Sequence, residues 1–141
     1  MNIRKLIALS LTVTALSCKS TDTNSPDTPT GTLRISEVLP NPVGEDKGNE
    51  AITLKNVTSN SAISLTGWQF RSKGIGSAFA VTTSATPITL SAGTSWSTTT
   101  FPFDRAWLSN DGDSLFLINP SGVVVHAVGW GKVGDGEVVK P

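Results

Sequence analysis

The chain is poor in cysteine, histidine and tyrosine, and each shortage removes a class of structure or chemistry. Cys18 is the only cysteine, which excludes an intramolecular disulfide and a zinc site built from several cysteines. Tyrosine is absent, and His126 is the only histidine. Long runs of Ala, Leu, Glu and Lys are missing, whereas Gly, Ser and Thr are abundant, so the composition favours strands and turns over a helical bundle. An apolar core must therefore hold the folded part together.

The sequence also lacks an excess of charge of either sign. Eleven basic residues balance eleven acidic ones. Loss of an N-terminal segment that contains Arg4 and Lys5 would leave nine basic against eleven acidic residues, a net charge of about −2. Nucleic-acid-binding proteins usually carry a basic excess or a basic stripe. We therefore expect no direct binding to nucleic acid.

The first residues have the anatomy of an export signal. Arg4 and Lys5 form a short positive region, and Leu6–Leu16 is an uncharged, mostly apolar stretch. Because a membrane-spanning helix needs about 20 apolar residues, this stretch is too short to span a bilayer. Residues 1–17 are therefore predicted to be a signal peptide.

The sequence Thr14-Ala15-Leu16-Ser17-Cys18 ends this segment and resembles the lipobox of bacterial lipoproteins. The resemblance implies cleavage before Cys18 and lipid attachment at Cys18, although Ala15 stands where Leu is more usual. Two or more acyl chains anchor a protein stably, whereas one chain binds only marginally. We expect a lipid-anchored protein of the bacterial cell envelope, held in the membrane through Cys18. The alternative is an ordinary signal peptide with an incidental cysteine.

The residue after the cysteine bears on the location of the anchor, and the segment that follows bears on its reach. Lys19 stands where Asp would signal retention in an inner membrane, so we expect the outer membrane if the organism has one.

Residues 19–32 are Ser, Thr, Pro, Asp, Asn, Gly and Lys, with no large apolar side chain. Such a segment cannot bury enough surface to offset the entropy lost on ordering. Residues 18–32 are predicted to be a lipid-anchored, disordered and flexible tether, and residues 33–141 the folded domain.

Short runs of strand-forming residues with frequent turns make up this domain. Leu33–Leu39 alternates apolar and polar residues, as a half-buried strand does. Trp68 and Phe70 share one face by the period of two, which places both in the core. A turn signal at residues 119–122 lies between two such runs and predicts a hairpin, and residues 95–99 are expected to pair after a turn at 91–93. The expected strands cover residues 33–39, 51–57, 63–71, 78–82, 88–90, 95–99, 114–118 and 123–130, a pattern typical of an all-β sandwich or barrel.

Three segments together resemble the lamin tail domain family. They are LRISEVLPNPVGEDKGNEAITLKNV (33–57), SLTGWQF (64–70) and LSNDGDSLFLINPSGVVVHAVGWGK (108–132). The shared features are the Pro-Asn-Pro turn, the Gly-Asn-Glu before the second strand, the Leu-x-Gly-Trp and the Asn-x-Gly-Asp. The resemblance covers residues 31–141 and implies an immunoglobulin-like β-sandwich of short antiparallel strands. Family members often have Trp-x-Glu-Leu after the Gly-Asn-Glu, whereas this chain has Ala51-Ile52-Thr53-Leu54. The chain therefore lacks the tryptophan and the glutamate of that pattern, which puts any role of the missing carboxylate in doubt.

The candidate sites for chemistry are weak. His126 lies in an expected strand, on the face with Val124, Val128 and Trp130, and has no partner visible in the sequence, so we expect a structural role. Asn110-Asp111-Gly112-Asp113 and the acidic loop formed by Glu37, Glu45, Asp46 and Glu50 lack the spacing of an EF-hand; a solvated loop is the expectation and calcium the alternative. The glycine-rich residues 129–136 lack the ending of a phosphate loop. We expect no catalytic residue, cofactor or metal.

Aromatic residues and the family resemblance guide the functional expectation. Among the tryptophans, Trp96 and Trp107 lie in less patterned sequence and are the better surface candidates for a ligand platform. The remaining apolar residues fit a thin core that leaves little volume for a deep pocket. The first hypothesis is a non-catalytic envelope module for protein or glycan interaction or for envelope architecture. The alternatives are an accessory domain of a secreted enzyme such as a nuclease, as the family association implies, and a small hydrolase using Asp and Glu.

Overall fold

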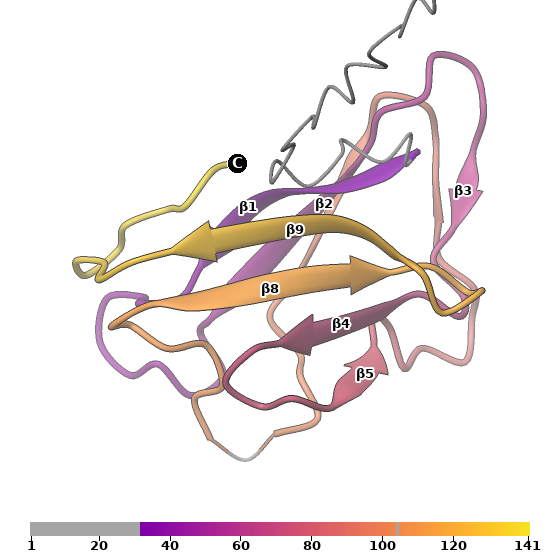
Figure 1. The fold of residues 1–141 in the computed structure, drawn as a ribbon. Coiled ribbons are helices and arrows are strands. Elements are labelled where there is room, and N and C mark those ends of the chain that lie inside the picture. The colour runs from indigo at the N-terminus through magenta and orange to yellow at the C-terminus, as the bar shows by residue number, and fades with distance from the viewer. Residues whose placement is uncertain (1–31, 104) are drawn as a thin grey trace, which may run out of the picture.

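The computed structural model describes residues 32–103 and 105–141, which form nine β-strands (Figure 1). The predicted signal peptide, the lipid site at Cys18 and all but the last residue of the predicted tether lie outside the described residues. No helix that could span a membrane occurs within the described ranges. The strands are β1 (Leu33–Leu39), β2 (Ala51–Asn56), β3 (Ile63–Ser64), β4 (Gln69–Ser72), β5 (Ala78–Ala80), β6 (Thr89–Leu90), β7 (Ser95–Thr98), β8 (Asp113–Ile118) and β9 (Val124–Trp130).

The strands form three antiparallel sheets. One sheet has the order β1-β2-β7, a second has the order β5-β4-β8-β9, and β3 and β6 pair by themselves. β1 and β9 lie side by side, so the two larger sheets meet along these strands (Figure 1). The arrangement confirms the predicted all-β, immunoglobulin-like β-sandwich of short antiparallel strands.

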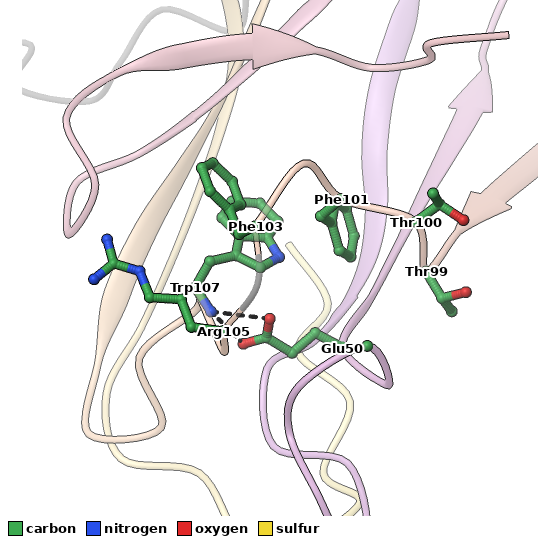
Figure 2. Close-up of a pocket in the computed structure, with 8 residues that line it drawn as sticks. Glu50, Thr99, Thr100, Phe101, Phe103, Arg105 and Trp107 are labelled. Atoms are coloured by element: carbon green, nitrogen blue, oxygen red, sulfur yellow. Dashed lines mark hydrogen bonds between the residues drawn. The ribbon is translucent and has the colours of Figure 1, made fainter.

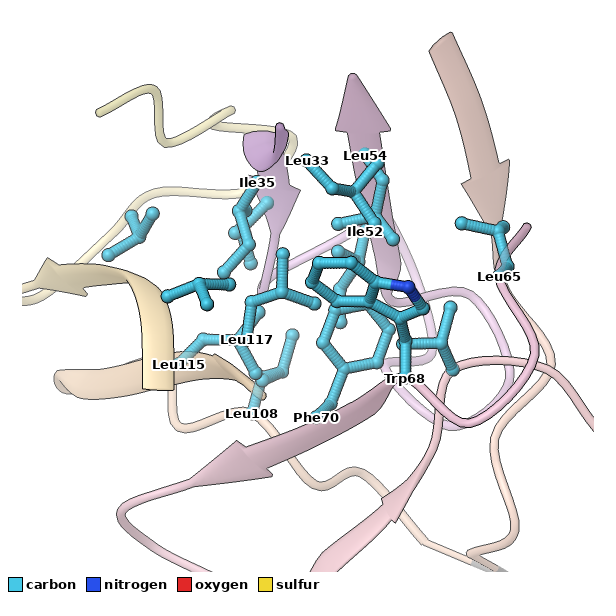
Figure 3. Close-up of a cluster of buried hydrophobic side chains, with 14 of the residues drawn as sticks. Leu33, Ile35, Ile52, Leu54, Leu65, Trp68, Phe70, Leu108, Leu115 and Leu117 are labelled. Carbon is cyan, nitrogen blue, oxygen red and sulfur yellow. The ribbon is translucent and has the colours of Figure 1, made fainter. Parts of the chain in front are cut away.

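The core lies between the sheets and is built by alternation along the strands. In β1 the side chains of Leu33, Ile35 and Val38 are fully buried, and in β2 those of Ile52 and Leu54 are. A register shift in β1 between Ile35 and Glu37 explains why the alternation skips a residue there. Leucines of β8 face these residues from the opposite sheet (Figure 3).

Trp68 and Phe70 lie in the middle of this core, as the sequence predicted (Figure 3). Trp68 is only 7% exposed and Phe70 is fully buried. The turn before them explains the Leu-x-Gly-Trp sequence. Gly67 has a φ of +80°, and a Cβ at this position would lie 3.2 Å from the Cβ of Pro120. Only glycine accepts both the left-handed backbone and the close approach without strain.

That turn also divides a predicted strand. Residues 63–71 were expected to be one strand, but they form β3 and β4, and these strands belong to different sheets. Likewise β7 pairs with β2, while β6, the strand before it in the chain, pairs with β3. Residues 95–98 therefore pair after the turn at 91–93, but their partner is β2 and not β6.

The hairpin predicted around residues 119–122 is confirmed. β8 and β9 pair antiparallel, and Asn119 stabilises the turn between them. Its side-chain Oδ1 accepts hydrogen bonds from the backbone N–H groups of Ser121 and Val123 at 3.0 and 2.9 Å. A side-chain acceptor of this kind is the usual reason for asparagine in a turn.

Candidate binding site at one end of the sandwich

Glu50 is a buried carboxylate immediately before β2. It is 1% exposed. Its Oε1 and Oε2 accept hydrogen bonds from the backbone N–H of Trp107 at 3.2 and 3.0 Å (Figure 2). Its Oε1 also accepts one from the backbone N–H of Leu108 at 2.8 Å. The expectation that Glu50 belongs to a solvated acidic loop is wrong. The signal for burial was in the sequence, because Glu50 shares the period-two face of Ile52 and Leu54.

The environment of Glu50 changes its acidity. Loss of solvation raises its pKa from 4.5 to about 7. The hydrogen bonds from Trp107 and Leu108 act in the opposite direction because they favour the charged form, and the nearby charge of Asp46 raises the pKa further. Glu50 is therefore poised to change its protonation near neutral pH while it holds the segment after Phe103.

Four aromatic side chains pack together above this carboxylate. Phe79 contacts Trp107 edge to face with ring centroids 4.8 Å apart, and Phe103 lies 5.0 Å from Phe79 in the same geometry. Phe101 completes the cluster at 4.8 Å from Trp107. Edge-to-face contacts at these distances are favourable because the ring edge is positive and the face negative.

Trp107 is a core residue, so its expected place on the surface is wrong. It is 5% exposed. Sequence pattern could not show this, because the described residues 99–103 and 105–112 form no strand and Glu50 holds Trp107 and Leu108 by hydrogen bonds. The indole Nε1 of Trp107 is buried and makes no hydrogen bond with any residue that the structure describes. A buried donor without a partner is uncommon in folded proteins.

A hollow of about 290 Å³ opens beside Glu50 and the aromatic cluster (Figure 2). Aromatic rings form one wall, the exposed Arg105 lies at the rim, and threonines face the other side. Such a site can offer ring edges for apolar contact, a guanidinium donor and the carboxyl group of Glu50. The lining residues are Gly48, Glu50, Thr99, Thr100, Phe101, Phe103, Arg105 and Trp107.

Comparison with protein families identifies the fold's lineage. A family model described as Lamin Tail Domain matches residues 26–132. The chain belongs to the lamin tail domain family. The match includes β1 to β9 and the whole wall of the Glu50 hollow, so the hollow is built on the family's own framework. No curated protein sequence matches this chain.

The other acidic residues of this lamin tail domain are held by separate partners. Glu37 forms a 3.0 Å ion pair with Lys140, and Asp46 accepts a 2.7 Å hydrogen bond from Asn110 Nδ2. The backbone carbonyl of Glu45 accepts a hydrogen bond from Asn49. The side chains of Glu37 and Asp46 therefore bind different partners, whereas the contact of Glu45 is made by its backbone carbonyl. Among residues 32–103 and 105–141, no group of three or more His, Cys, Asp or Glu residues is placed to hold a metal ion.

His126 connects the two sheets of the lamin tail domain. Its Nδ1 accepts a 3.3 Å hydrogen bond from the backbone N–H of Ile35 in β1. Partial burial lowers the pKa of His126, and the positive charge of Arg34 lowers it further. The neutral ring is the form that can accept this hydrogen bond, so the environment favours the state that joins β1 to β9.

The predicted face of His126 is only partly correct. Val128 is buried, but Val124 is 39% exposed and Val125 is buried in its place. The pairing of β8 with β9 shifts register between Leu117 and Ile118, and this bulge turns the neighbouring side chains to the other face. A period of two cannot reveal a bulge.

Trp96 is still a surface candidate for a ligand platform. It is half-buried on β7, the edge strand of the first sheet, and packs against the core from outside. Together with Val81, Thr82 and Thr98 it lines a hollow of about 260 Å³. Sequence pattern placed Trp96 and Trp107 alike, and only the structure separates the partly exposed residue from the buried one.

Proposed function

We propose that this chain is a non-catalytic, lipid-anchored module of the bacterial cell envelope that contacts a protein or glycan partner or supports envelope architecture. The observation that carries the proposal is the hollow beside Glu50 and the aromatic cluster. It combines aromatic rings and a guanidinium at one end of the sandwich. Aromatic and arginine side chains of this kind are enriched in binding sites.

Among the described residues, the two groups with shifted pKa values support a binding role over catalysis. Glu50 accepts three backbone hydrogen bonds, and His126 accepts one. General acid–base catalysis requires the titrating atom to be aimed at a substrate proton. In this lamin tail domain the titrating atoms are instead aimed at backbone N–H groups, where they hold segments together.

The anchor in this proposal rests on the sequence of residues 1–18. An uncharged stretch that ends in Ser17-Cys18, followed by a polar tether, fits a lipid anchor with reach. A shallow hollow gains little affinity from a free small ligand, whereas many copies held on one surface bind an extended partner by avidity. A membrane anchor would therefore raise the overall affinity of a shallow site for an extended partner.

The test is site-specific photo-crosslinking of the full-length protein in intact cells. A photoreactive amino acid replaces the exposed Thr100 at the rim of the hollow, and the control position is the exposed Ser121, in the turn at the opposite end of β8 (Figure 1). We expect a discrete adduct from position 100 that Arg105→Glu abolishes and Lys55→Glu leaves intact. Equal adducts from both positions, or none, would contradict a partner at this hollow. An adduct with a secreted enzyme would favour the accessory-domain alternative.

A further inference from the structure

A third hollow lies around Asp113, the first residue of β8. It measures about 490 Å³, more than a thin core led us to expect, and its walls come from the ends of β4 and β9 and the start of β8. Figure 1 shows these three ends gathered on the left side of the sheet. The lining residues are Lys73, Gly74, Ser109, Gly112, Asp113, Ser114 and Trp130, which we name the Asp113 hollow. None of them lines the hollow beside Glu50.

Asp113 is a buried carboxylate with one oxygen satisfied and one not. It is 8% exposed. Its Oδ1 accepts hydrogen bonds from the backbone N–H groups of Gly74 at 3.1 Å and Ser114 at 2.7 Å. Its Oδ2 is buried and accepts none from any residue of the described ranges. An unpaired buried carboxylate oxygen is costly, so a donor supplied from outside would stabilise the site considerably.

The wall beside Oδ2 is made by a residue without a side chain. A Cβ on Gly74 would lie 3.3 Å from Oδ2 of Asp113 and 3.8 Å from the hydroxyl of Ser72. Gly74 has an ordinary negative-φ backbone, since it is not among the glycines with positive φ. Glycine is therefore not required there by the backbone, and a side chain at this position would press against Oδ2 of Asp113.

The chemistry of the walls defines the ligand. Asp113 needs a hydrogen-bond donor, the ammonium of Lys73 needs an acceptor, and the hydroxyls of Ser109 and Ser114 provide either. Trp130 contributes part of its indole ring, which is held in place by a 2.8 Å hydrogen bond from Nε1 to the carbonyl of Ser109. One carboxylate and one ammonium leave the site close to neutral.

We infer that the Asp113 hollow binds one residue of a neutral, hydroxyl-rich sugar chain. A sugar ring is the ligand class that carries donors and acceptors side by side and an apolar C–H face for the indole. A hydroxyl donating to Oδ2 of Asp113 would make a charge-assisted hydrogen bond, while neighbouring hydroxyl oxygens accept from Lys73. This inference rests on the proposed binding function and selects glycan over protein as the partner at this site.

The test uses the acylated full-length chain in a detergent without a sugar headgroup, followed by two-dimensional NMR of its backbone amides and tryptophan indoles. The probes are neutral oligosaccharides of glucose, galactose, mannose and N-acetylglucosamine, and an oligosaccharide of uronic acid as the charged counterpart. We expect at least one neutral probe to shift the Trp130 indole and the Gly74 amide in a saturable manner, with the charged probe weaker. Free oligosaccharide and purified envelope polysaccharide are compared to distinguish a soluble sugar from an envelope polymer.

The variants make the site specific. Gly74→Ala places a methyl group beside Oδ2 and should weaken binding at least tenfold, whereas Gly131→Ala, with no atom within 4 Å of its added Cβ, should leave it within twofold. Asp113→Asn replaces the charged acceptor and should weaken binding about tenfold. Equal binding by wild type and Gly74→Ala, or saturable shifts at neither residue with any probe, would overturn the inference. A crosslinked partner at position 100 would then still stand, so the two proposals fail separately.

Discussion

The sequence around Glu50 supports two opposite predictions of its exposure to solvent. Its charge and its neighbours Glu45 and Asp46 suggest a solvated loop, whereas its place two residues before Ile52 puts it on the buried face of β2. The structure confirms the second prediction, because Glu50 is buried. The same face ends in Asn56, which is fully buried and whose Nδ2 donates hydrogen bonds to the carbonyls of Ser61 and Leu90. Polar residues at both ends of a strand's buried face therefore fix the segments that cross those ends.

The raised pKa of Glu50 predicts an unusual dependence of stability on pH. The folded state holds this proton up to about pH 7, whereas the unfolded state releases it near 4.5. The folded state therefore binds more protons between these values, and stability falls as pH rises through this window, by roughly 3 kcal/mol for a shift of this size. Glu50→Gln should remove this slope, while Glu37→Gln, at an exposed ion pair, should keep it. Urea unfolding of the three proteins between pH 4 and 8 measures the difference; identical slopes would contradict the prediction.

Trp68 tests the core at the scale of a single side chain. It is 7% exposed and packs among Phe70 and leucines of both sheets. Trp68→Ala should lower the free energy of unfolding by about 3–5 kcal/mol, through lost burial and the cavity that remains. Thermal unfolding followed by circular dichroism provides the measurement. A variant that melts within a few degrees of wild type would mean that the side chain is dispensable for the core.

At the scale of elements, sequence pattern predicts strands better than their partners. Leu33–Leu39, the second strand and the last hairpin were predicted because alternation and turn residues are local signals. The division of residues 63–71 at Gly67 depends on the approach of Pro120, which is more than 50 residues away. The bulges in β1 and β9 depend on how the two sheets meet. The position of Trp107 and Leu108 depends on their hydrogen bonds to Glu50. These features arise from contacts distant in sequence, and periodicity carries no information about them.

The junction of β1 and β9 carries a testable role for His126. Both strands are irregular at this point, and the N–H of Ile35 finds its acceptor in the His126 ring. Because folding lowers the pKa of His126, the unfolded state binds the proton more readily than the folded state does. The contribution of His126 to the free energy of unfolding is therefore fully present above pH 6.5 and is lost as pH falls below that value. His126→Ala should leave the Ile35 N–H without this partner and destabilise the domain by about 1–3 kcal/mol at pH 8, with a smaller loss at pH 5. A loss that is larger at pH 5 would contradict this account, and Ser121→Ala serves as a neutral control.

At the scale of the whole molecule, the predicted anchor decides where the domain works. If Ser17-Cys18 is a lipoprotein cleavage site, the full chain should incorporate radiolabelled fatty acid and partition into detergent. Cys18→Ala should abolish labelling and leave unprocessed precursor, whereas Ser20→Ala, two residues beyond, should behave as wild type. Labelling, phase partition and the apparent mass of the product are the measurements. A wild-type protein that takes up no fatty acid would show that the segment is an ordinary signal peptide.

The Glu50 hollow, the Asp113 hollow and the titrating residues together predict a molecule that binds without turning over its ligand. Glu50 and His126 are the described residues whose shifted pKa values would suit acid–base chemistry, and both accept hydrogen bonds from backbone N–H groups. Asp113 has a free oxygen, but its neighbours are Lys73, serines and Trp130, and a second carboxylate at the 5–10 Å spacing of a glycosidase pair is not among the residues that line its hollow. The full-length protein should therefore leave oligosaccharides, peptides and nucleic acids intact, with or without added divalent metal, and Glu50→Gln and His126→Ala should retain its cellular role if they fold. Turnover assays with chromatographic detection of products, alongside circular dichroism of each variant, provide the check. A metal-dependent turnover that either substitution abolishes in a folded protein would assign those residues to catalysis and make the enzyme alternative the correct one.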